Sequence, residues 1–507
     1  MGGWMGGRGT CSSAHKVRGM STIKHWWVLN RNSSNASSSN ARRPPGPVPI
    51  PLFGNIFDLQ GEPHHALAKL AAVHGPVMSL KFGTTTAIVA SSAAGARDVL
   101  QKYDHLLAAR SITDAGRALG NHERSIVWLP CTSPLWKRLR AVCTNHLFSA
   151  RSLDATRAVR EEKVRELVGC LHGHAGETVE VGRVVFSGVL NLVSNVLFSE
   201  DVADMSSEGA QELEMLIRGM VEEFTRPNLS DLFPVLSALD LQGCRRRSAQ
   251  HLRRFSDFFD RIVGRRMKGA AAGERNDDFL DVLLQLHSEN QLSLESLNCF
   301  LQDLFISGAE TNSITVEWTM AELLRQPAVM TKVRDELREA LGSKKHPDES
   351  DIGKMPYLRA VVMETMRLHP ASPLMMPHEA MANGAEVGGL AVSKGTKVIV
   401  NLWAIMRDPA SWTQPEEFVP ERFLGADLDF RSKDQAEFMP FGAGRRACPG
   451  TPMATRVVTL ILASLLHAFE WRLPEGMQPC DVDVRDRFAT SLKMLTPLKA
   501  VPVPLFQ

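Results

Sequence analysis

Apolar residues recur along most of this chain at the three- and four-residue spacing of amphipathic helices. Over residues 154–171, charged side chains alternate with apolar ones at this spacing, which places the apolar residues on one helix face. The pattern returns over residues 320–341. A long helix is predicted from about Cys299 to Gln326, ending before Pro327. Most of the chain is therefore predicted to be helical.

Residues 457–466 form a mainly apolar run. It covers 10 residues, whereas a membrane-spanning helix needs about 20. We interpret this run as a buried core helix.

Strand patterns are fewer and shorter than helical ones. Short apolar runs occupy residues 77–82 and 86–90, on either side of the turn-forming Gly83, and a third lies at 396–405. A stretch rich in glycine and arginine at 264–276 is predicted to be an exposed loop. The predicted fold class is mainly α with a small β subdomain.

A proline-rich segment, RRPPGPVPIPLFGN, covers residues 42–55. Each proline ring fixes φ and removes a backbone donor, so this segment is predicted to be a stiff, extended hinge. Residues 56–507 then show no repeat, no long low-complexity linker and no second shift in composition. We predict that they form one catalytic domain.

Residues 1–41 precede this hinge as a disordered or targeting segment. The first 43 residues contain no Asp or Glu and are rich in Ser, Asn and Gly. Their one apolar cluster, residues 26–29, is far shorter than the roughly 20 residues that span a bilayer. Two interpretations stay open: an organelle transit peptide, or a misassembled first exon in place of a membrane anchor.

Charge and cysteine content narrow the possible functions. The formal net charge of +2 is small for 507 residues, so nucleic-acid binding is not predicted as the main activity. The 8 cysteines include no CxxC pair and lack the tight spacing of a disulfide framework or a zinc site, which favours a reducing compartment. Only Cys448 has a distinctive neighbourhood.

Cys448 lies in the segment FMPFGAGRRACPG, residues 438–450. Glycines let the backbone approach a flat macrocycle, an arginine can pair with a propionate, and a thiolate donates electron density to iron. Five residues fall on the pattern F-x-x-G-x-R-x-C-x-G: Phe441, Gly444, Arg446, Cys448 and Gly450. This pattern resembles the haem-binding signature of the cytochromes P450.

The resemblance to cytochromes P450 extends from about residue 42 to the C-terminus. It implies the cytochrome P450 fold, a haem b cofactor, and Cys448 as the axial ligand of the iron. It also implies a monooxygenase reaction, in which dioxygen is split and the substrate is hydroxylated. The haem carries this chemistry and the protein positions it.

A second group of residues resembles a structural cluster of the family. Glu364 and Arg367 are three residues apart, so they share a helix face and can pair. The family adds an arginine from a downstream P-E-R-F turn, which here is Arg422. By resemblance, these three residues form a buried ionic cluster that supports folding.

The predicted long helix contains SGAET at residues 307–311. A glycine inside a helix costs up to about 1 kcal/mol relative to alanine, so Gly308 indicates the close approach of another group. In the family, the helix deforms here to admit dioxygen. By resemblance, Thr311 supports oxygen activation and Glu310 relays protons, while Ser307 stands where alanine or glycine is usual. A bond from the Thr311 hydroxyl to the Ser307 carbonyl could coexist with that role.

Two further elements are expected beside the haem. Trp136 and Arg140 match the family's W-x-x-x-R pattern, which reaches a propionate from one helix face. His378 follows Pro377 at a position where the family commonly has an arginine or histidine that contacts the other propionate.

Within the family, several phrases resemble plant enzymes of the geraniol-hydroxylase and ferruginol-synthase type, among them SIVWLP at 125–130 and TVEWTMAELLRQP at 315–327. This implies hydroxylation of a small lipophilic metabolite, with a terpenoid expected and flavonoids or alkaloids as alternatives. Residues 372–376, with Phe305 and Ile306, are predicted to form an apolar pocket wall.

The resemblance also implies a redox partner, because the chain has no flavin or nicotinamide domain of its own. Electrons are expected from an NADPH-dependent cytochrome P450 reductase. A basic docking surface could come from Lys137, Arg138, Arg445 and Arg456. By resemblance, the protein lies at the endoplasmic-reticulum membrane, with plastid or mitochondrion as the alternative.

Two rival functions from other classes remain open. A haem-thiolate isomerase or dehydratase would need no reductase, but the match at Glu310 and Thr311 argues against it. A non-catalytic haem-binding protein would fit the unusual Ser307.

Overall fold

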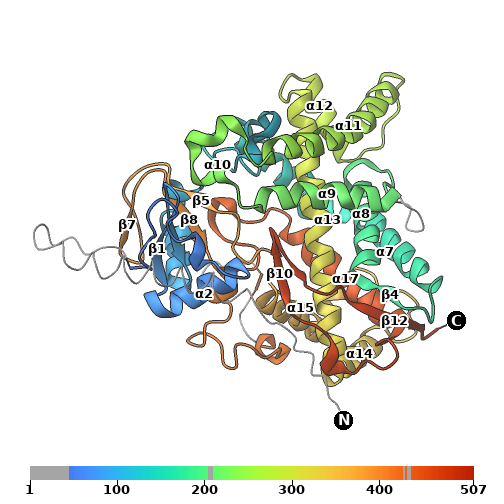
Figure 1. Ribbon diagram of the computed structural model, residues 1–507. Helices are drawn as coiled ribbons and strands as arrows, with labels where there is room; N and C mark the ends of the chain where they lie inside the picture. The colour runs from blue at the N-terminus through green and yellow to red at the C-terminus, as the bar shows by residue number, and fades with distance from the viewer. Residues whose placement is uncertain (1–44, 204–208, 426–428, 431–434, 507) are drawn as a thin grey trace, which may run out of the picture.

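The computed structural model describes residues 45–203, 209–425, 429–430 and 435–506. Figure 1 shows a strand-rich part on the left, coloured blue and orange, and a larger helical part on the right. The long helix α13 (Leu294–Arg325) runs through the middle of the helical part. The predicted N-terminal segment, residues 1–41, lies outside the described residues.

α-Helices make up most of the described chain, which confirms the predicted fold class. Their bounds are α2 (Pro63–His74), α3 (Ala93–Arg97), α4 (Asp104–Leu107), α5 (Pro134–Val142), α6 (Ala150–Ala155), α7 (Arg157–His172), α8 (Val181–Phe198), α9 (Gly209–Thr225), α10 (Leu229–Leu232), α11 (Cys244–Ala271), α12 (Phe279–Ser288), α13 (Leu294–Arg325), α14 (Pro327–Leu341), α15 (Pro356–Leu368), α16 (Leu402–Ile405) and α17 (Thr451–Ala468).

The strands form one mixed sheet and three smaller ones. Their bounds are β1 (Val77–Phe82), β2 (Thr85–Ala90), β3 (Ala109–Arg110), β4 (Val179–Glu180), β5 (His378–Glu379), β6 (Ala385–Val387), β7 (Leu390–Val392), β8 (Lys397–Val400), β9 (Phe469–Arg472), β10 (Asp486–Ala489), β11 (Ser491–Met494) and β12 (Lys499–Pro504). The mixed sheet has the order β1-β2-β8-β5-β3, with β2 and β8 parallel and the other pairs antiparallel. The first two predicted strands are confirmed as β1 and β2.

The third predicted strand, residues 396–405, is only half correct. β8 ends at Val400, and α16 begins at Leu402. Asn401 causes the change, because its side chain accepts a hydrogen bond from the backbone N–H of Ala404 and so caps the short helix.

The predicted loop at 264–276 is wrong over most of its length, because α11 continues to Ala271. The guanidinium of Arg266 is buried, donates at 2.8–2.9 Å to Asp278 and Asp281, and also donates to the Phe198 carbonyl at 2.7 Å. The ion pairs of Arg266 with Asp278 and Asp281 thus stabilise the last turns of α11, although a stretch rich in glycine and arginine is typical of a loop.

The proline segment also differs from the extended hinge that was predicted. The backbone reverses between Ile50 and Gly54, which exchange hydrogen bonds of 2.9 and 2.7 Å. Leu52 and Gly54 have φ of +68° and +69°, which close this turn. The Pro45 carbonyl accepts from the N–H of Ser79 in β1, so the segment is fastened to the sheet.

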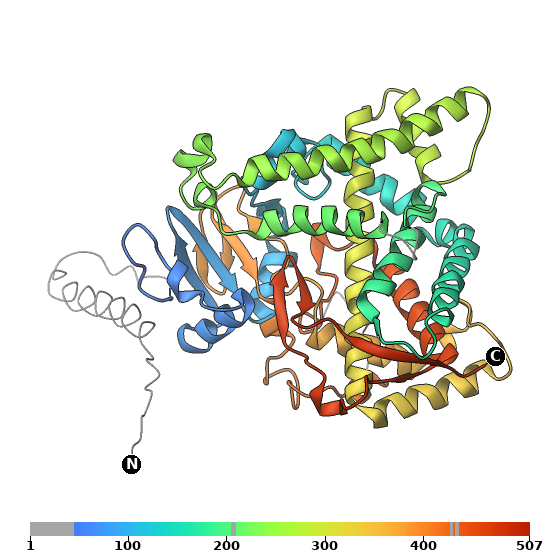
Figure 2. The same cartoon turned by 45° about the vertical axis from the view of Figure 1, so that its right-hand side comes forward.

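The core of the helical part is built around α13 and α17. Two helices in the described part of the chain, Val181–Phe198 and Thr451–Ala468, are long and apolar enough to cross a membrane, and 72% of each is buried inside the protein. The prediction of a buried core helix at 457–466 is therefore confirmed. Figure 2 shows the C-terminal hairpin β10–β11 lying beside α13.

Candidate functional site

The segment that holds Cys448 is a tight loop leading into α17. The N–H of Cys448 donates to the Phe441 carbonyl at 2.9 Å, which closes the loop. Gly444 has φ of +68°, and a side chain there would collide with the Leu100 carbonyl. Both features bring the loop backbone close to its neighbours and fix the position of the cysteine.

The Cys448 side chain is accessible although it lies near the buried Cys143. Burial within the protein raises the pKa of its thiol, whereas backbone N–H groups of Gly450 and Thr451 and the charge of Arg140 lower it. A bound metal cation would favour the thiolate outright. An accessible thiol surrounded by N–H donors fits the role of an iron ligand.

Positive charge gathers beside this loop without balancing carboxylates. Arg110 and His378 are register partners on β3 and β5. Burial lowers the pKa of Arg110 to about 9 and that of His378 to about 3. Among the described residues, no carboxylate pairs with Arg110, Arg140 or Arg446, and the buried Nε2 of His378 has no hydrogen-bond partner. Partly buried arginines without carboxylate partners, next to an unpartnered imidazole nitrogen, indicate an anionic ligand, and two haem propionates fit this requirement.

Sequence reasoning missed Arg110. It is a single arginine within a two-residue strand, and no spacing marks it. Only its pairing with His378 across the sheet shows that it belongs to the site.

Trp136 lies between two arginines of the site. The guanidinium of Arg140 is 5.7 Å from its ring centroid, and that of Arg446 is 5.2 Å away. Arg140 also donates to the Ala447 carbonyl at 3.0 Å, which joins α5 to the cysteine loop. The three residues expected beside the haem from this region are thus brought together.

Arg446 is bonded to backbone carbonyls. It donates to the carbonyls of Ala108 at 2.9 Å, Ile126 at 3.2 Å and Leu129. These bonds fasten the cysteine loop to the segment that precedes α5.

Asp303 of α13 holds the same segment from the other side. Its partly buried carboxylate accepts the backbone N–H of Ile126 at 2.9 Å and further bonds from Ser125 and Val127. Burial raises the pKa of Asp303 to about 7. The sequence motif did not mark this residue, because its partners lie more than 170 positions away.

The SGAET turn lies on α13, which is helical throughout. The deformation that the resemblance implies stays a prediction, and side chains bond to the carbonyls of this turn. Thr311 donates to Ser307 at 2.7 Å, and Asn312 donates to Gly308 at 2.6 Å. The group close to Gly308 is Val193 of α8, whose methyl carbons would lie 3.2–3.3 Å from an added Cβ.

Glu310 does not lie free beside Thr311. Its carboxylate is buried and pairs with the ammonium group of Lys493 on β11 at 2.5 Å. No local pattern in the chain marks Lys493 as this partner.

The predicted ionic cluster of Glu364, Arg367 and Arg422 forms at the C-terminal end of α15. Arg367 donates to both carboxylate oxygens of Glu364, at 2.7 and 2.9 Å, and Arg422 adds a bond of 3.0 Å. The remaining donors of Arg367 bind the carbonyls of Met406, Pro415 and Glu417. The cluster therefore fixes the long connection between α16 and the cysteine loop.

One predicted member of the pocket wall is wrong. Phe305 is fully buried and packs on Phe198, Phe255 and Phe259 at centroid distances of 5.6–6.3 Å. It faces α8 and α11 and belongs to the core. Met375 does lie beside the cysteine loop, because its methyl carbon would meet a side chain at Gly442 at 2.7 Å.

Comparison with known proteins agrees with this geometry. A family model described as cytochrome P450 matches residues 44–497. The chain is 49% identical to oryzalexin E synthase of Oryza sativa subsp. japonica, over 99% of this chain and 98% of that protein. It is 48% identical to ent-cassadiene C11-alpha-hydroxylase 1 of the same species, over 91% and 93% of the two chains.

More distant relatives extend the comparison. The chain is 42% identical to geraniol 8-hydroxylase of Catharanthus roseus, over 91% of this chain and 94% of that protein. A zebrafish cytochrome P450 solved with progesterone superposes with a TM-score of 0.76 at 28% identity, over 88% of this chain and 100% of that chain. With the cysteine loop and the unbalanced basic cluster, these matches establish that the chain belongs to the cytochrome P450 family of haem-thiolate monooxygenases.

Proposed function

We propose that the protein hydroxylates a small terpenoid, using dioxygen and electrons from an NADPH-dependent cytochrome P450 reductase. The observation that carries the substrate class is the near full-length similarity to enzymes named for geraniol and ent-cassadiene hydroxylation. The apolar Met375 next to the cysteine loop suits a lipophilic substrate.

The residues described above divide the work of the reaction. Bound haem, ligated by Cys448, supplies the activation of dioxygen. Arg110 and Arg140 would hold its propionates because they are arginines without carboxylate partners, and the neutral His378 could donate to a propionate from Nε2, which has no partner in the protein. The Thr311 hydroxyl carries a proton in the turn of α13 that contains Gly308. The neighbouring Glu310 can accept a proton from solvent.

Hydroxylation of flavonoids or alkaloids is the alternative within the same chemistry. Reconstituting the enzyme with a plant reductase tests the proposal: terpenols, diterpenes, flavonoids and alkaloids are screened by haem difference spectra, and products are identified by mass spectrometry. Product from a terpenoid that requires reductase and NADPH supports the proposal. Turnover without reductase would indicate an isomerase or dehydratase, and binding without any product would indicate a non-catalytic protein.

Thr311→Ala is expected to separate substrate binding from oxygen activation. The variant loses the hydroxyl and its bond to the Ser307 carbonyl, and it keeps the backbone carbonyl that accepts from Thr315. We expect unchanged haem content and substrate affinity, while product per NADPH falls by roughly tenfold or more and hydrogen peroxide rises. Thr315→Ala is the matched control, because its hydroxyl bonds back to Thr311 in the same way. Equal coupling in both variants would remove Thr311 from the mechanism.

The proposed reductase surface contains basic residues near the cysteine loop. Lys137 and Arg138 are exposed on α5. Arg445 pairs with Asp104 at 3.3 Å, and Arg456 lies 3.4 Å from Asp154. These acids reduce the free positive charge of the last two residues, so Lys137 and Arg138 are the stronger candidates for contact with an acidic partner.

We propose that the protein lies on the cytosolic face of the endoplasmic-reticulum membrane. Two groups of exposed apolar side chains support this, and we name them the apolar rim: Val48, Leu52, Phe53, Phe57, Leu229, Val235, Leu239 and Leu241. The groups are adjacent, because the N–H of Thr84 in the β1–β2 turn donates to the Leu232 carbonyl. Large exposed apolar patches are typical of membrane contact.

A double substitution in the apolar rim is expected to weaken membrane binding. Val235 and Leu239 are 85% and 64% exposed, so Val235→Glu with Leu239→Glu should leave folding intact. Co-sedimentation of residues 45–507 with neutral phospholipid vesicles should fall by roughly tenfold, since each such side chain contributes about 1.5–3 kcal/mol on burial. Val73→Glu, at a residue 77% exposed on α2, is the control. If all three proteins sediment equally, the rim does not bind membranes. Fusing residues 1–43 to a fluorescent protein tests the plastid and mitochondrial alternatives.

A further inference from the structure

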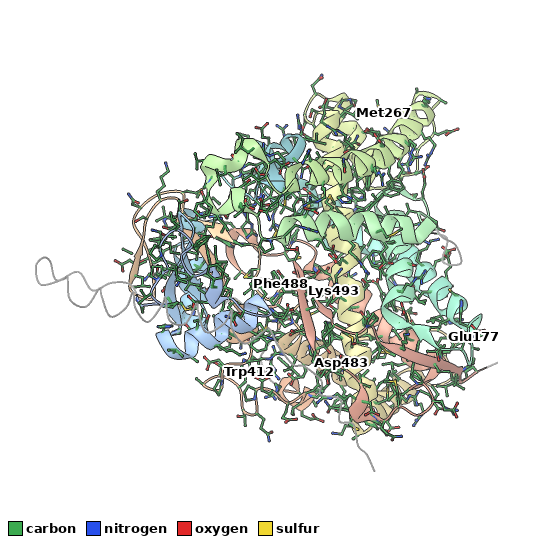
Figure 3. The ribbon with its side chains drawn as sticks, viewed as in Figure 1. Glu177, Met267, Trp412, Asp483, Phe488 and Lys493 are labelled. Atoms are coloured by element: carbon green, nitrogen blue, oxygen red, sulfur yellow. The ribbon has the colours of Figure 1, made fainter. Side chains whose placement is uncertain are left out.

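Three side chains that can bind a metal ion meet where α2 contacts the β10–β11 hairpin. His64 and His65 lie in the first turn of α2, and Asp486 is the first residue of β10. One ligand atom from each of the three lies within 4.8 Å of the other two. Figure 3 shows the hairpin, with Phe488 labelled, between the strand-rich part of the molecule and α13. The three side chains therefore lie at the joint between the two parts of the fold.

The Asp486 carboxylate lies between the two imidazole rings. Its Oδ2 atom is hydrogen-bonded to Nε2 of His65 at 3.2 Å, and its Oδ1 atom lies 3.3 Å from Nε2 of His64. The second contact lacks the geometry of a hydrogen bond. Both of its atoms, and Nδ1 of His64 as well, are buried without a hydrogen-bond partner among the described residues. Buried polar atoms without partners are rare, and here they indicate a site for an ion.

The donor atoms and their spacing fit Zn²⁺. Imidazole nitrogen and carboxylate oxygen bind Zn²⁺ at about 2.0–2.1 Å, so neighbouring ligands of a tetrahedral site are about 3.3–3.4 Å apart. The contacts of Asp486 with the two histidines, at 3.2 and 3.3 Å, are close to this spacing. In the described part of the chain, no lysine or arginine forms a salt bridge with Asp486, so its charge is available to a metal cation. Mg²⁺ and Ca²⁺ prefer oxygen ligands, and two imidazoles disfavour them.

The surroundings fix one histidine and leave the other accessible. The side chain of Asn401 donates to the His64 carbonyl at 3.0 Å, which holds the start of α2. The Trp403 ring packs on both histidines, with centroid distances of 5.5 Å to His64 and 4.5 Å to His65, and Phe488 packs on His64 at 6.0 Å. His64 is fully buried, whereas the side chain of His65 is 34% exposed. An ion and a water ligand can therefore enter from the side of His65.

We propose that His64, His65 and Asp486 bind one Zn²⁺ ion, with water as the fourth ligand, and that this ion fastens the β10–β11 hairpin to α2. The hairpin is also bonded to the helical part, because the Leu492 carbonyl accepts from the indole N–H of Trp318 on α13 at 2.8 Å. Bound zinc therefore joins the two parts of the fold through the hairpin and stabilises the folded protein. The site shares no residue with the haem site and is independent of the proposed hydroxylation.

The first test measures Zn²⁺ binding to the full-length haem protein after treatment with a chelator. Zn²⁺ is titrated by calorimetry, and bound metal is counted by mass spectrometry. Asp486→Asn keeps the side-chain shape and removes the charge, and His65→Gln removes a ligand at an accessible position. We expect one tightly bound ion in the wild type and a loss of affinity of roughly tenfold or more in each variant. His74→Gln, on the same helix but outside the cluster, is the matched control and should bind like the wild type.

The second test identifies the ligands by X-ray absorption at the zinc edge. Nitrogen and oxygen neighbours at about 2.0–2.1 Å, with the outer signal of two imidazoles, are expected, whereas sulfur at about 2.3 Å would mean that a cysteine binds the ion. Zinc should also raise the thermal midpoint of the wild type and of His74→Gln, and not that of Asp486→Asn. If Asp486→Asn does not fold, judged by haem content and circular dichroism, His65→Gln decides. A wild type without a tightly bound Zn²⁺, an unchanged affinity in the ligand variants, or a sulfur neighbour would overturn the proposal.

Discussion

Replacing Cys448 with serine is expected to abolish the thiolate-type carbon monoxide spectrum and all monooxygenase turnover. A serine hydroxyl is not the electron-donating thiolate on which O–O cleavage depends. The basic cluster of Arg110, Arg140 and His378 is untouched by the change, so the variant should still take up some haem. The measurements are the reduced carbon monoxide difference spectrum and product formation with reductase.

Cys143→Ser provides the matched control for this result. Cys143 is fully buried close to Cys448, and burial raises the pKa of its thiol to about 12. Because the Cys143 thiol ionises so unfavourably, it should not serve as the iron ligand. Cys143→Ser should therefore keep the thiolate-type spectrum. A thiolate-type spectrum in Cys448→Ser would show that the ligand has been assigned to the wrong cysteine.

Arg367→Met is expected to destabilise the protein by about 3–5 kcal/mol, because removing one partner of a buried ionic cluster leaves an unpaired charge. The change leaves Glu364 with Arg422 alone and also removes donors from the carbonyls of Met406, Pro415 and Glu417. Urea unfolding followed by circular dichroism, together with haem retention on warming, measures the loss.

Two further variants separate charge from geometry in this cluster. Arg367→Lys keeps the charge but not the planar fork, so an intermediate loss is expected. Arg422→Met should be milder, because Arg422 is 12% exposed whereas Arg367 is fully buried. If Arg367→Met unfolds at the same urea concentration as the wild type, the cluster does not support the fold.

Local sequence patterns predicted those elements whose partners lie nearby in the chain. The loop around Cys448, the pairing of Glu364 with Arg367 and the end of α13 before Pro327 depend on residues within one or two turns. The start of α13 was placed at Cys299, five residues late, because Ser293 caps the helix and its first turn reads as polar.

Features set by distant partners could not be predicted in this way. The apolar character of Phe305 fits a pocket wall and the core equally well, and only its contacts with α8 and α11 place it in the core. α11 extends through 264–271 because Arg266 meets acids beyond its end. Arg110 and Lys493 carry no local pattern, and their roles depend on a strand register and on a hairpin more than 180 residues from Glu310.

The segment from Ser125 to Leu129 is held at both sides, by Asp303 of the long helix and by Arg446 of the cysteine loop. It therefore works as a physical strap between the two walls of the haem site. A substrate large enough to push this strap would have to break bonds to one wall or drag the other with it. The size of the substrate should therefore affect the position of the Cys448 thiolate as well as the shape of the pocket. The haem spectrum should then change with substrate size even when the substrate does not contact Cys448.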